Sequence, residues 1–313
     1  SVGGDGSNEP TMRKRNQAKI FGKCMAKLQS QKQIILFFFI TFCVVVSSYV
    51  PISKSRRLAS NFLWLTTNDN RQVIELDDGD TMEVISRSVD IEKDWSIQVW
   101  EQYHPSAIMD HYWQTQFGRA KALDPFGLVN WPGSVVAATE LRRCRREIIN
   151  STVLVVGAGV GVEAQALAQL GAKRVIATDY NPMTIQLLEY GAKAAGLDTI
   201  ITTRQFDLAG NEPLPECDIM VASDVMYSDR LAGVIGQRCM ELLQLDTGKK
   251  ILVSDSQRLS DFLPILQKQL GESLSWEERN LEAFSGSGVM IDEDQTYDVK
   301  ARVLKIGWEK TAV

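Results

Sequence analysis

The sequence predicts an α/β fold of the Rossmann-like kind, in which helices cover both faces of a mostly parallel, seven-stranded sheet. Three observations predict it. Short apolar runs that suit buried strands alternate with helical segments from residue 152 onward. A glycine-rich turn with Gly157, Gly159 and Gly161 joins the first of these strands to the next helix. The final run, residues 296–308, alternates apolar and polar residues as a half-exposed strand does.

The individual elements follow from local signals. A helix over residues 133–148 is expected to lead into a buried strand at 153–156. The helix after the glycine turn should end at Gly171, and Asn181 should cap the next helix with Pro182 in its first turn, where a missing N–H does no harm. The remaining strands are expected at 175–179, 199–208, 218–225 and 250–256, and the helices at 162–170, 182–196, 228–244 and 260–271.

Residues 1–68 differ in composition from the rest of the chain. Between Pro10 and Asn68 there are ten basic residues and no acidic one, and the thirteen residues 34–46 are almost wholly apolar. A membrane-spanning helix needs about 20 apolar residues, whereas the core of a signal peptide needs about 7–15. The stretch 54–68 is basic, acid-free and rich in hydroxyl groups, as transit peptides are. We therefore expect a segment that targets the chain to a plastid or the secretory route, or a membrane anchor with contact through residues 34–50.

Two further regions are expected after this segment. Residues 69–130 form a prelude, with a hairpin that turns at Asp78–Gly79. The part from Gln98 to Gly127 is rich in aromatic residues but has no clear period, so no element is predicted there. Residues 131–313 carry the regular strand and helix pattern, and form the main domain.

The charge of the chain argues against some classes of partner. From Asp69 onward there are 24 basic and 37 acidic residues, so this part repels phosphate backbones, and no nucleic-acid partner is expected. The basic run 142–147 lies at the end of a predicted helix and is interpreted as a solvated face. The five cysteines have no paired spacing and only two histidines occur, which indicates no disulfide framework and no metal site. We expect a monomer.

The glycine turn indicates the kind of ligand. A dinucleotide site usually has the spacing G-x-G-x-x-G, but here the spacing is G-x-G-x-G and Val162 follows. This suits a cofactor without phosphates that the backbone approaches closely, although glycines also occur in such turns for steric reasons alone. Asp179 ends the next strand, where a carboxylate accepts ribose hydroxyls. Asp207 ends the third strand, beside an adenine edge or as a loop cap.

Four segments carry a resemblance to a known family: VNWPGSVVAATEL, VLVVGAGVG, VIATDYNPMTIQLLEYGA and DIMVASDVMYSD. Together they resemble the successive motifs of the seven-strand protein-lysine methyltransferases (the methyltransferase-16-like family) over residues 128–230. The resemblance implies a class I methyltransferase fold, S-adenosyl-L-methionine as cofactor and a lysine of a protein as acceptor. It implies that Asp224 and Tyr227, the family's Asp-x-x-Tyr, are catalytic. The cofactor-binding residues that it implies are Trp131, Gly157, Ala158, Gly159, Gly161, Asp179, Tyr180, Asp207, Leu208 and Ser223.

The sequence departs from the family pattern at two positions. Val155 stands two places before the first glycine, where the family usually has an acidic residue, and Gly191 stands where an Asn is often found. The first change removes a carboxylate from beneath the methionine end of the cofactor. The second indicates a different acceptor side.

The expected chemistry sets a requirement on the site. A lysine amine with a pKa near 10.4 is neutral about one time in 2,500 at pH 7, an effective cost of about 4.6 kcal/mol. The site must therefore help deprotonation or hold the amine in a dry channel. Asp224 and Tyr227 are expected to orient the amine through a hydrogen bond and an aromatic face.

Other functions remain open at this point. A small-molecule N- or O-methyltransferase uses the same scaffold, because a fold does not specify its acceptor. A membrane-tethered module that has lost methyl transfer is favoured by Val155. An NAD(P) dehydrogenase is disfavoured by Val162 and by the lack of a catalytic His, Tyr or Lys constellation.

Overall fold

The computed structural model describes residues 70–103, 125–246, 248–256, 261–271, 274–284 and 297–309. These residues all belong to the compact unit Thr66–Val313. The predicted targeting segment 1–68, the apolar run within it, and both histidines lie outside the described residues. In the part that is described, no helix has the length and apolar character needed to cross a membrane.

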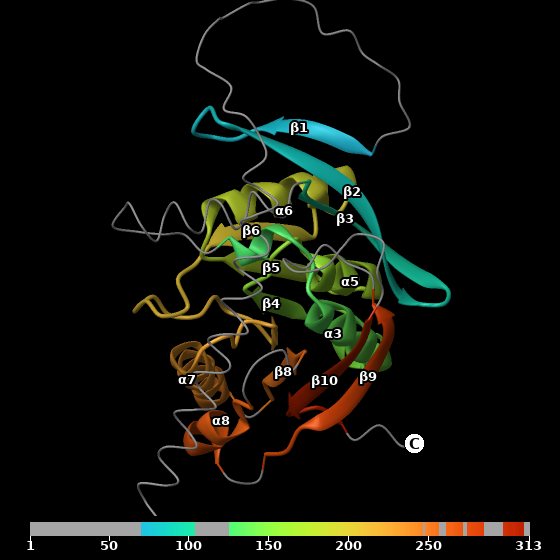
Figure 1. Cartoon of the computed structure of the whole chain (residues 1–313). Coiled ribbons are helices and arrows are strands. Elements are labelled where there is room, and N and C mark those ends of the chain that lie inside the picture. Colours follow the sequence, from blue (N-terminus) through green and yellow to red (C-terminus); the bar gives the residue numbers. More distant parts are fainter. Residues whose placement is uncertain are drawn as a thin grey trace, which may run out of the picture. The chain divides into compact units, whose positions relative to one another are not determined.

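The main sheet has seven strands in the order β6-β5-β4-β7-β8-β10-β9 (Figure 1). Strands β4 to β8 pair in parallel, whereas β10 is antiparallel to both β8 and β9. The prediction of a mostly parallel, seven-stranded sheet is confirmed. Strand β9 was not predicted from the sequence, because five of its eight residues, EERNLEAF, are charged or polar. The strands are β4 (Thr152–Val156), β5 (Arg174–Asp179), β6 (Ile201–Gln205), β7 (Ile219–Ser223), β8 (Lys250–Asp255), β9 (Glu277–Phe284) and β10 (Tyr297–Ile306).

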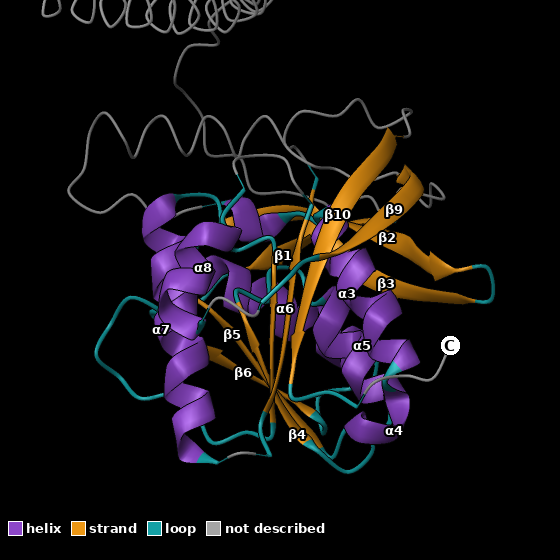
Figure 2. Ribbon diagram, turned by 90° about the horizontal axis from the view of Figure 1, so that it is seen from below, coloured by secondary structure: helices purple, strands orange, loops and turns teal. Residues whose placement is uncertain are grey.

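Helices cover both faces of this sheet (Figure 2). On one face, α3 (Pro132–Arg143), α5 (Val162–Leu170) and α6 (Pro182–Ala194) enclose an apolar core with β4 and β7. On the other, α7 (Asp229–Leu245) and α8 (Leu263–Leu270) enclose a second core. The helix predicted over 133–148 is interrupted at Cys144, whose N–H bonds back to the carbonyls of Glu140 and Leu141, and a short α4 (Arg145–Ile148) follows.

The predicted end of α5 and the predicted start of α6 are confirmed. Asn181 Oδ1 accepts a hydrogen bond of 2.9 Å from the N–H of Met183, and Pro182 occupies the first turn of α6. Gly171 ends α5 in a left-handed conformation, with a φ of 100°.

A separate antiparallel sheet precedes the main one. It consists of β1 (Arg71–Glu75), β2 (Thr81–Glu92) and β3 (Trp95–Gln102), and the predicted hairpin joins β1 to β2 with Gly79 at a φ of 84°. Strand β3 was not predicted, and its part from Gln98 onward falls in the region for which no element was assigned. The apolar side chains of this small sheet share one core with residues of α3, α5 and α6. The prelude is thus packed against the helices of the main domain.

A buried carboxylate joins this small sheet to the segment before α3. Glu101 of β3 is fully buried; its Oε1 accepts a hydrogen bond of 2.7 Å from the N–H of Asn130, and its Oε2 pairs with Arg87 Nε at 3.0 Å. The segment held in this way contains the short 3-10 helix η1 (Phe126–Leu128) and leads directly into α3. Its position therefore depends on the prelude.

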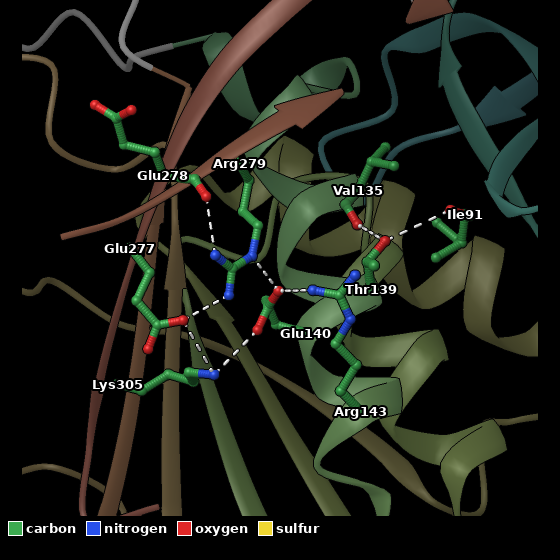
Figure 3. Close-up of polar contacts among 9 residues, drawn as sticks. All are labelled: Ile91, Val135, Thr139, Glu140, Arg143, Glu277, Glu278, Arg279 and Lys305. Carbon is green, nitrogen blue, oxygen red and sulfur yellow. Dashed lines mark hydrogen bonds and ion pairs between the residues drawn. The ribbon is translucent and has the colours of Figure 1, made fainter. Parts of the chain in front are cut away.

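A second buried carboxylate ties α3 to the antiparallel edge of the main sheet (Figure 3). Glu140 is only 1% exposed and pairs with Arg279 Nε of β9 at 2.6 Å, Lys305 Nζ of β10 at 3.1 Å and Arg143 at 2.5 Å. Burial raises the pKa of Glu140, but the pairs with Arg279 and Lys305 outweigh burial, so the pKa lies below its ordinary value. Arg143, Arg145 and Arg146 of the basic run 142–147 are exposed, as the solvated-face interpretation predicts, and Arg143 adds one exposed ion pair to this cluster.

Candidate functional site

A pocket of about 460 Å³ lies where β4, β5, β6 and β7 end. Ligands of open α/β sheets bind at the carboxyl ends of the strands, so this is the position that the fold favours. The turns after the four strands contribute Gly157 to Val160, Asp179 and Tyr180, Phe206 to Ala209, and Ser223 to Val225; the segment before α3 and the start of α7 complete the lining.

The structure brings the sequence-predicted residues together. Every predicted site residue except Gly161 lines this pocket. Gly161 instead forms the N-cap of α5, with a φ of 87° that favours glycine. The residues that line the pocket are Trp131, Gly157, Ala158, Gly159, Asp179, Tyr180, Asp207, Leu208, Ser223, Asp224 and Tyr227.

The glycine turn approaches its neighbours closely. Gly157 has a φ of 63°, and a Cβ at this position would overlap the side chain of Val225. Gly159 has a φ of 51°, and a Cβ there would lie 3.3 Å from the carbonyl oxygen of Gly127. A larger residue at either position would therefore have to displace a neighbour that lines the pocket. That the backbone of this turn approaches a ligand stays a prediction.

Asp179 holds this turn in place. Its Oδ2 accepts a hydrogen bond of 3.2 Å from the N–H of Gly159, and its Oδ1 accepts one of 3.0 Å from the N–H of Asn181. The same carboxylate lines the pocket at the end of β5, and carboxylate oxygens accept hydrogen bonds from hydroxyl groups. The geometry suits the predicted contact with ribose.

The far end of the pocket has an apolar floor and a polar rim. Phe206 is buried, Leu208 is half-buried and Asp207 is exposed, with its Oδ1 accepting a 2.9 Å bond from the N–H of Ala209. Tyr180 also belongs to the lining and is 42% exposed. This combination suits a flat aromatic base, and Asp207 serves as a loop cap at the same time.

Asp224 links three parts of the site. It adopts a φ of 52°, is 8% exposed, and its Oδ2 accepts a 2.8 Å bond from the N–H of Gly133 at the start of α3. Its Oδ1 accepts a 2.7 Å bond from the N–H of Ser256, just after β8. The carboxylate thus fixes the end of β7 against α3 and β8. The prediction that it contacts an acceptor stays a prediction.

Three aromatic rings form one wall of the pocket. Trp131 donates a 2.7 Å hydrogen bond from its Nε1 to the carbonyl oxygen of Phe126. The ring of Phe126 meets those of Trp131 and Tyr227 edge to face, with centroid distances of 6.1 and 5.6 Å. Tyr227 is 39% exposed, which places it at the mouth. Such rings favour a cationic or methylated amine.

Sequence reasoning missed part of the lining. Phe126 and Gly127 come from the region without a predicted element, and no local signal marks them. Phe206 adjoins the predicted Asp207, and Ser134 lies within the segment VNWPGSVVAATEL, so both were within reach of the same motifs. The other missed residues are Val129, Val160, Ala209, Val225, Ser228, Arg230 and Leu231.

The charge of the pocket distinguishes between ligands. Among the described residues that line it, three carry a carboxylate and only Arg230 carries a positive charge. A pyrophosphate would be repelled by this surface, whereas a cationic sulfonium would be attracted. The described residues hold no group of three or more His, Cys, Asp or Glu suited to a metal ion, and the described cysteines are buried and free.

Two features define the class of fold. The antiparallel strand β10 lies between β8 and the edge strand β9, and an acidic pocket lies at the ends of the parallel strands. Together they define a class I S-adenosylmethionine-dependent methyltransferase fold. The model of the ribosomal protein L11 methyltransferase (PrmA) family matches residues 44–244. This is more than half of the chain, and the chain belongs to that family.

Curated relatives agree on the class of protein. The ribosomal protein L11 methyltransferase of Anoxybacillus flavithermus is 26% identical over 199 residues, which is 58% of this chain and 60% of that protein. The histone-arginine methyltransferase METTL23 of Xenopus laevis is 33% identical over 111 residues, 34% of this chain and 47% of that protein. The electron transfer flavoprotein beta subunit lysine methyltransferase of Mus musculus is 27% identical over 109 residues, 35% of this chain and 42% of that protein.

These matches refine the family assignment. The chain spans 60% or less of the length of each of these relatives. They support a methyltransferase family in general and do not single out the methyltransferase-16-like group. The cofactor that the family implies is S-adenosyl-L-methionine, and the glycine turn, Asp179 and the acidic lining fit it.

Proposed function

We propose that the chain transfers a methyl group from S-adenosyl-L-methionine to the side-chain amine of a lysine in a protein. The observation that carries this proposal is the pocket itself. Carboxylates line it at the ends of the central strands, and an aromatic wall flanks its mouth. The first feature suits a cationic cofactor and the second suits an amine acceptor.

The residues of the chain would act mainly by positioning. Asp179 would accept the ribose hydroxyls, the turn from Gly157 to Gly159 would approach the cofactor through its backbone, and Phe206 and Leu208 would enclose the adenine. When bound, the cofactor supplies an activated methyl group. In-line transfer then depends on the orientation of the acceptor and the exclusion of water.

The acceptor amine must also lose its proton. Tyr227 and Trp131 would hold the amine against aromatic faces, where desolvation lowers the pKa of a lysine. The carboxylate of Asp224 already accepts two backbone hydrogen bonds, so we assign it to positioning the loop that carries Tyr227. A direct hydrogen bond from the acceptor to Asp224 is the alternative role within the same proposal.

A protein lysine is favoured over other acceptors for two reasons. From Asp69 onward the chain is strongly acidic, which suits basic protein segments and disfavours RNA. A relative named as a lysine methyltransferase matches over 35% of the chain, and the Asp-x-x-Tyr pattern at residues 224–227 resembles that of the methyltransferase-16-like group. A small-molecule amine or hydroxyl acceptor is the competing proposal on the same fold.

A module without methyl transfer is the second candidate. It is favoured by Val155, which is 1% exposed and packs in the apolar core. The methyltransferase-16-like family, which the sequence resembles, usually has an acidic residue at this position. Such a module would bind no cofactor, and this separates it from an enzyme.

The decisive experiment is incubation of the full chain with methyl-labelled S-adenosyl-L-methionine and a cell extract. We expect a labelled protein band whose modified residue maps to a lysine. Asp179→Ala should abolish labelling, while Asp78→Ala, at the exposed hairpin turn outside the pocket, should leave it intact. Label that appears only in RNA or in small molecules would contradict the proposed acceptor.

For the N-terminal part we propose that residues 1–68 direct the chain to a plastid or the secretory route, or hold it at a membrane through residues 34–50. The basic, acid-free composition and the apolar run support this. Fusion of residues 1–68 to a fluorescent protein, followed by membrane fractionation, tests it. A diffuse, unprocessed fusion would contradict it. We also propose that the enzyme acts as a monomer, which size-exclusion chromatography with light scattering tests.

A further inference from the structure

A buried carboxylate lies behind the pocket and has no role in the site described so far. Glu163 occupies the first turn of α5, two residues after Gly161, and is 2% exposed. Its Oε2 atom is buried and makes no hydrogen bond. A buried charge without a partner is costly, so such a group needs a compensating cation or remains neutral.

The surroundings of Glu163 connect it to the pocket. Ser134 of α3 and Ser223 of β7, two hydroxyl residues that line the pocket, lie beside its carboxyl group. The contact with Ser223 falls short of a well-formed hydrogen bond, because Ser223 Oγ is itself buried and unpartnered. Ser223 Oγ and Glu163 Oε2 are therefore both left without a hydrogen-bond partner behind the pocket.

The electrostatic environment favours the neutral acid in the absence of ligand. Burial raises the pKa of Glu163, the hydroxyls of Ser223 and Ser134 oppose this rise, and the negative charge of Asp224 adds to it. No cation is among the groups that shift this pKa. A cationic group brought by a ligand would reverse the balance.

Glu163 lies on the same face of the sheet as Val155, the position at which the methyltransferase-16-like family usually has an acidic residue. In the register of the sheet Val155 is opposite Val221, and both pack in the core beneath α3 and α5. Because side chains alternate along a strand, Ser223 points to this same face. Glu163 reaches this face from α5, and a carboxylate at position 155 would reach it from β4.

We propose that Glu163 is the counter-charge for the α-ammonium group at the methionine end of the bound cofactor, which it reaches through the hydroxyls of Ser134 and Ser223. Glu163, on α5, takes the place of the carboxylate that the methyltransferase-16-like family usually has on the strand, where this chain has Val155. The inference rests on the proposed function, because it requires that S-adenosyl-L-methionine occupies this pocket. Glu163 is a positioning residue, since it acts through the two serines.

Binding of the α-ammonium group changes the protonation of one residue, Glu163. The ammonium arrives with its protons and donates a hydrogen bond to a serine oxygen, and the serine hydroxyl donates to the carboxylate. Glu163, neutral in the empty pocket, releases its proton to solvent. Binding should therefore release a proton and strengthen as the pH rises through the raised pKa of this carboxyl.

The test compares two ligands by calorimetry. S-adenosylhomocysteine carries the α-ammonium group, whereas 5′-methylthioadenosine lacks the whole amino-acid end. Glu163→Gln should weaken binding of the first by about 10- to 100-fold, the range for hydrogen bonds to charged groups, and leave the second unchanged. Glu189→Gln, an exposed glutamate of α6, is the matched control and should change neither.

The outcomes separate the possible failures. Equal weakening of both ligands by Glu163→Gln, or no weakening of either, overturns the role of Glu163 while the proposed function stands. Absence of binding of both ligands to the wild type overturns the proposed function together with the inference. Should Glu163→Gln fail to fold, the wild type alone decides, because titrations in buffers of different ionisation enthalpy measure proton release. Zero release upon binding of S-adenosylhomocysteine overturns the inference.

Discussion

Removal of the Glu140 carboxylate tests how the antiparallel edge of the sheet is held to α3. In Glu140→Ala, Arg279 and Lys305 lose their shared partner at a site where the carboxylate is 1% exposed. Breaking a buried ion pair by removing one partner costs about 3–5 kcal/mol. The side chains of Arg279 and Lys305 are 26% and 15% exposed, so water can partly rehydrate them, and we expect a loss near the lower limit, about 3 kcal/mol.

The matched control lies in the same cluster. Arg143 pairs with the same carboxylate, but its side chain is 52% exposed. Exposed pairs contribute about 0.2–1 kcal/mol, so Arg143→Ala should cost under about 1 kcal/mol. Urea denaturation followed by circular dichroism measures both free energies of unfolding. Equal losses in the two variants, or a loss below about 1 kcal/mol in Glu140→Ala, would refute the assignment of a buried, stabilising cluster.

The pH dependence gives the same cluster a second test. The pKa of Glu140 in the folded chain lies below its ordinary value of 4.5. The folded state thus binds a proton less readily than the unfolded one, so the contribution is present above pH 4.5 and is lost as the pH falls through the lowered pKa. Glu140→Gln should reduce the loss of stability between neutral and acidic pH. A wild type and variant with parallel pH profiles would contradict this.

Three further predictions concern other parts of the chain. Gly157→Ala should weaken cofactor binding and cost about 1–3 kcal/mol of stability, measured by calorimetry and denaturation, because an alanine is strained at a φ of 63°; unchanged binding would contradict this. Burial raises the pKa of Cys217 and of Cys239 to about 12, so neither should react with a thiol reagent at pH 7 unless the chain is unfolded, and mass spectrometry would detect early labelling. Glu101→Ala removes the acceptor of the Asn130 N–H, so hydrogen exchange at that amide should accelerate and cofactor affinity should fall; an equally protected amide would refute the tether.

The sequence pattern alone predicted the strands that are buried at the centre of the main sheet. Strands β4, β7 and β8 are buried along nearly their whole length, and their apolar runs are visible without any knowledge of their neighbours. Strand β9 is different, because its charged residues are accommodated by partners such as Glu140, which lies far away in the sequence. Strand β3 carries the buried Glu101, and burial of this carboxylate is made possible by its partners, Arg87 and the N–H of Asn130 before α3.

The same distinction applies to the site. Residues on the turns after the strands, such as Asp179 and Asp207, were predicted because the strand that carries each one is itself recognisable. Phe126 was not, because no local signal marks it and its place in the wall of the pocket depends on a long-range contact with Tyr227. Glu163 was overlooked for a related reason: in the sequence it follows the glycine turn as one more helical residue, and only the fold places it behind two serines of the pocket.

The most direct test of the account is equilibrium titration of the full-length protein with S-adenosyl-L-methionine and, in parallel, with NAD⁺. We predict saturable binding of the first, weakened by Asp179→Ala, and no binding of the second, because three carboxylates line the pocket and would repel a pyrophosphate. Binding of NAD⁺, or failure of S-adenosyl-L-methionine to bind, would contradict the central claim.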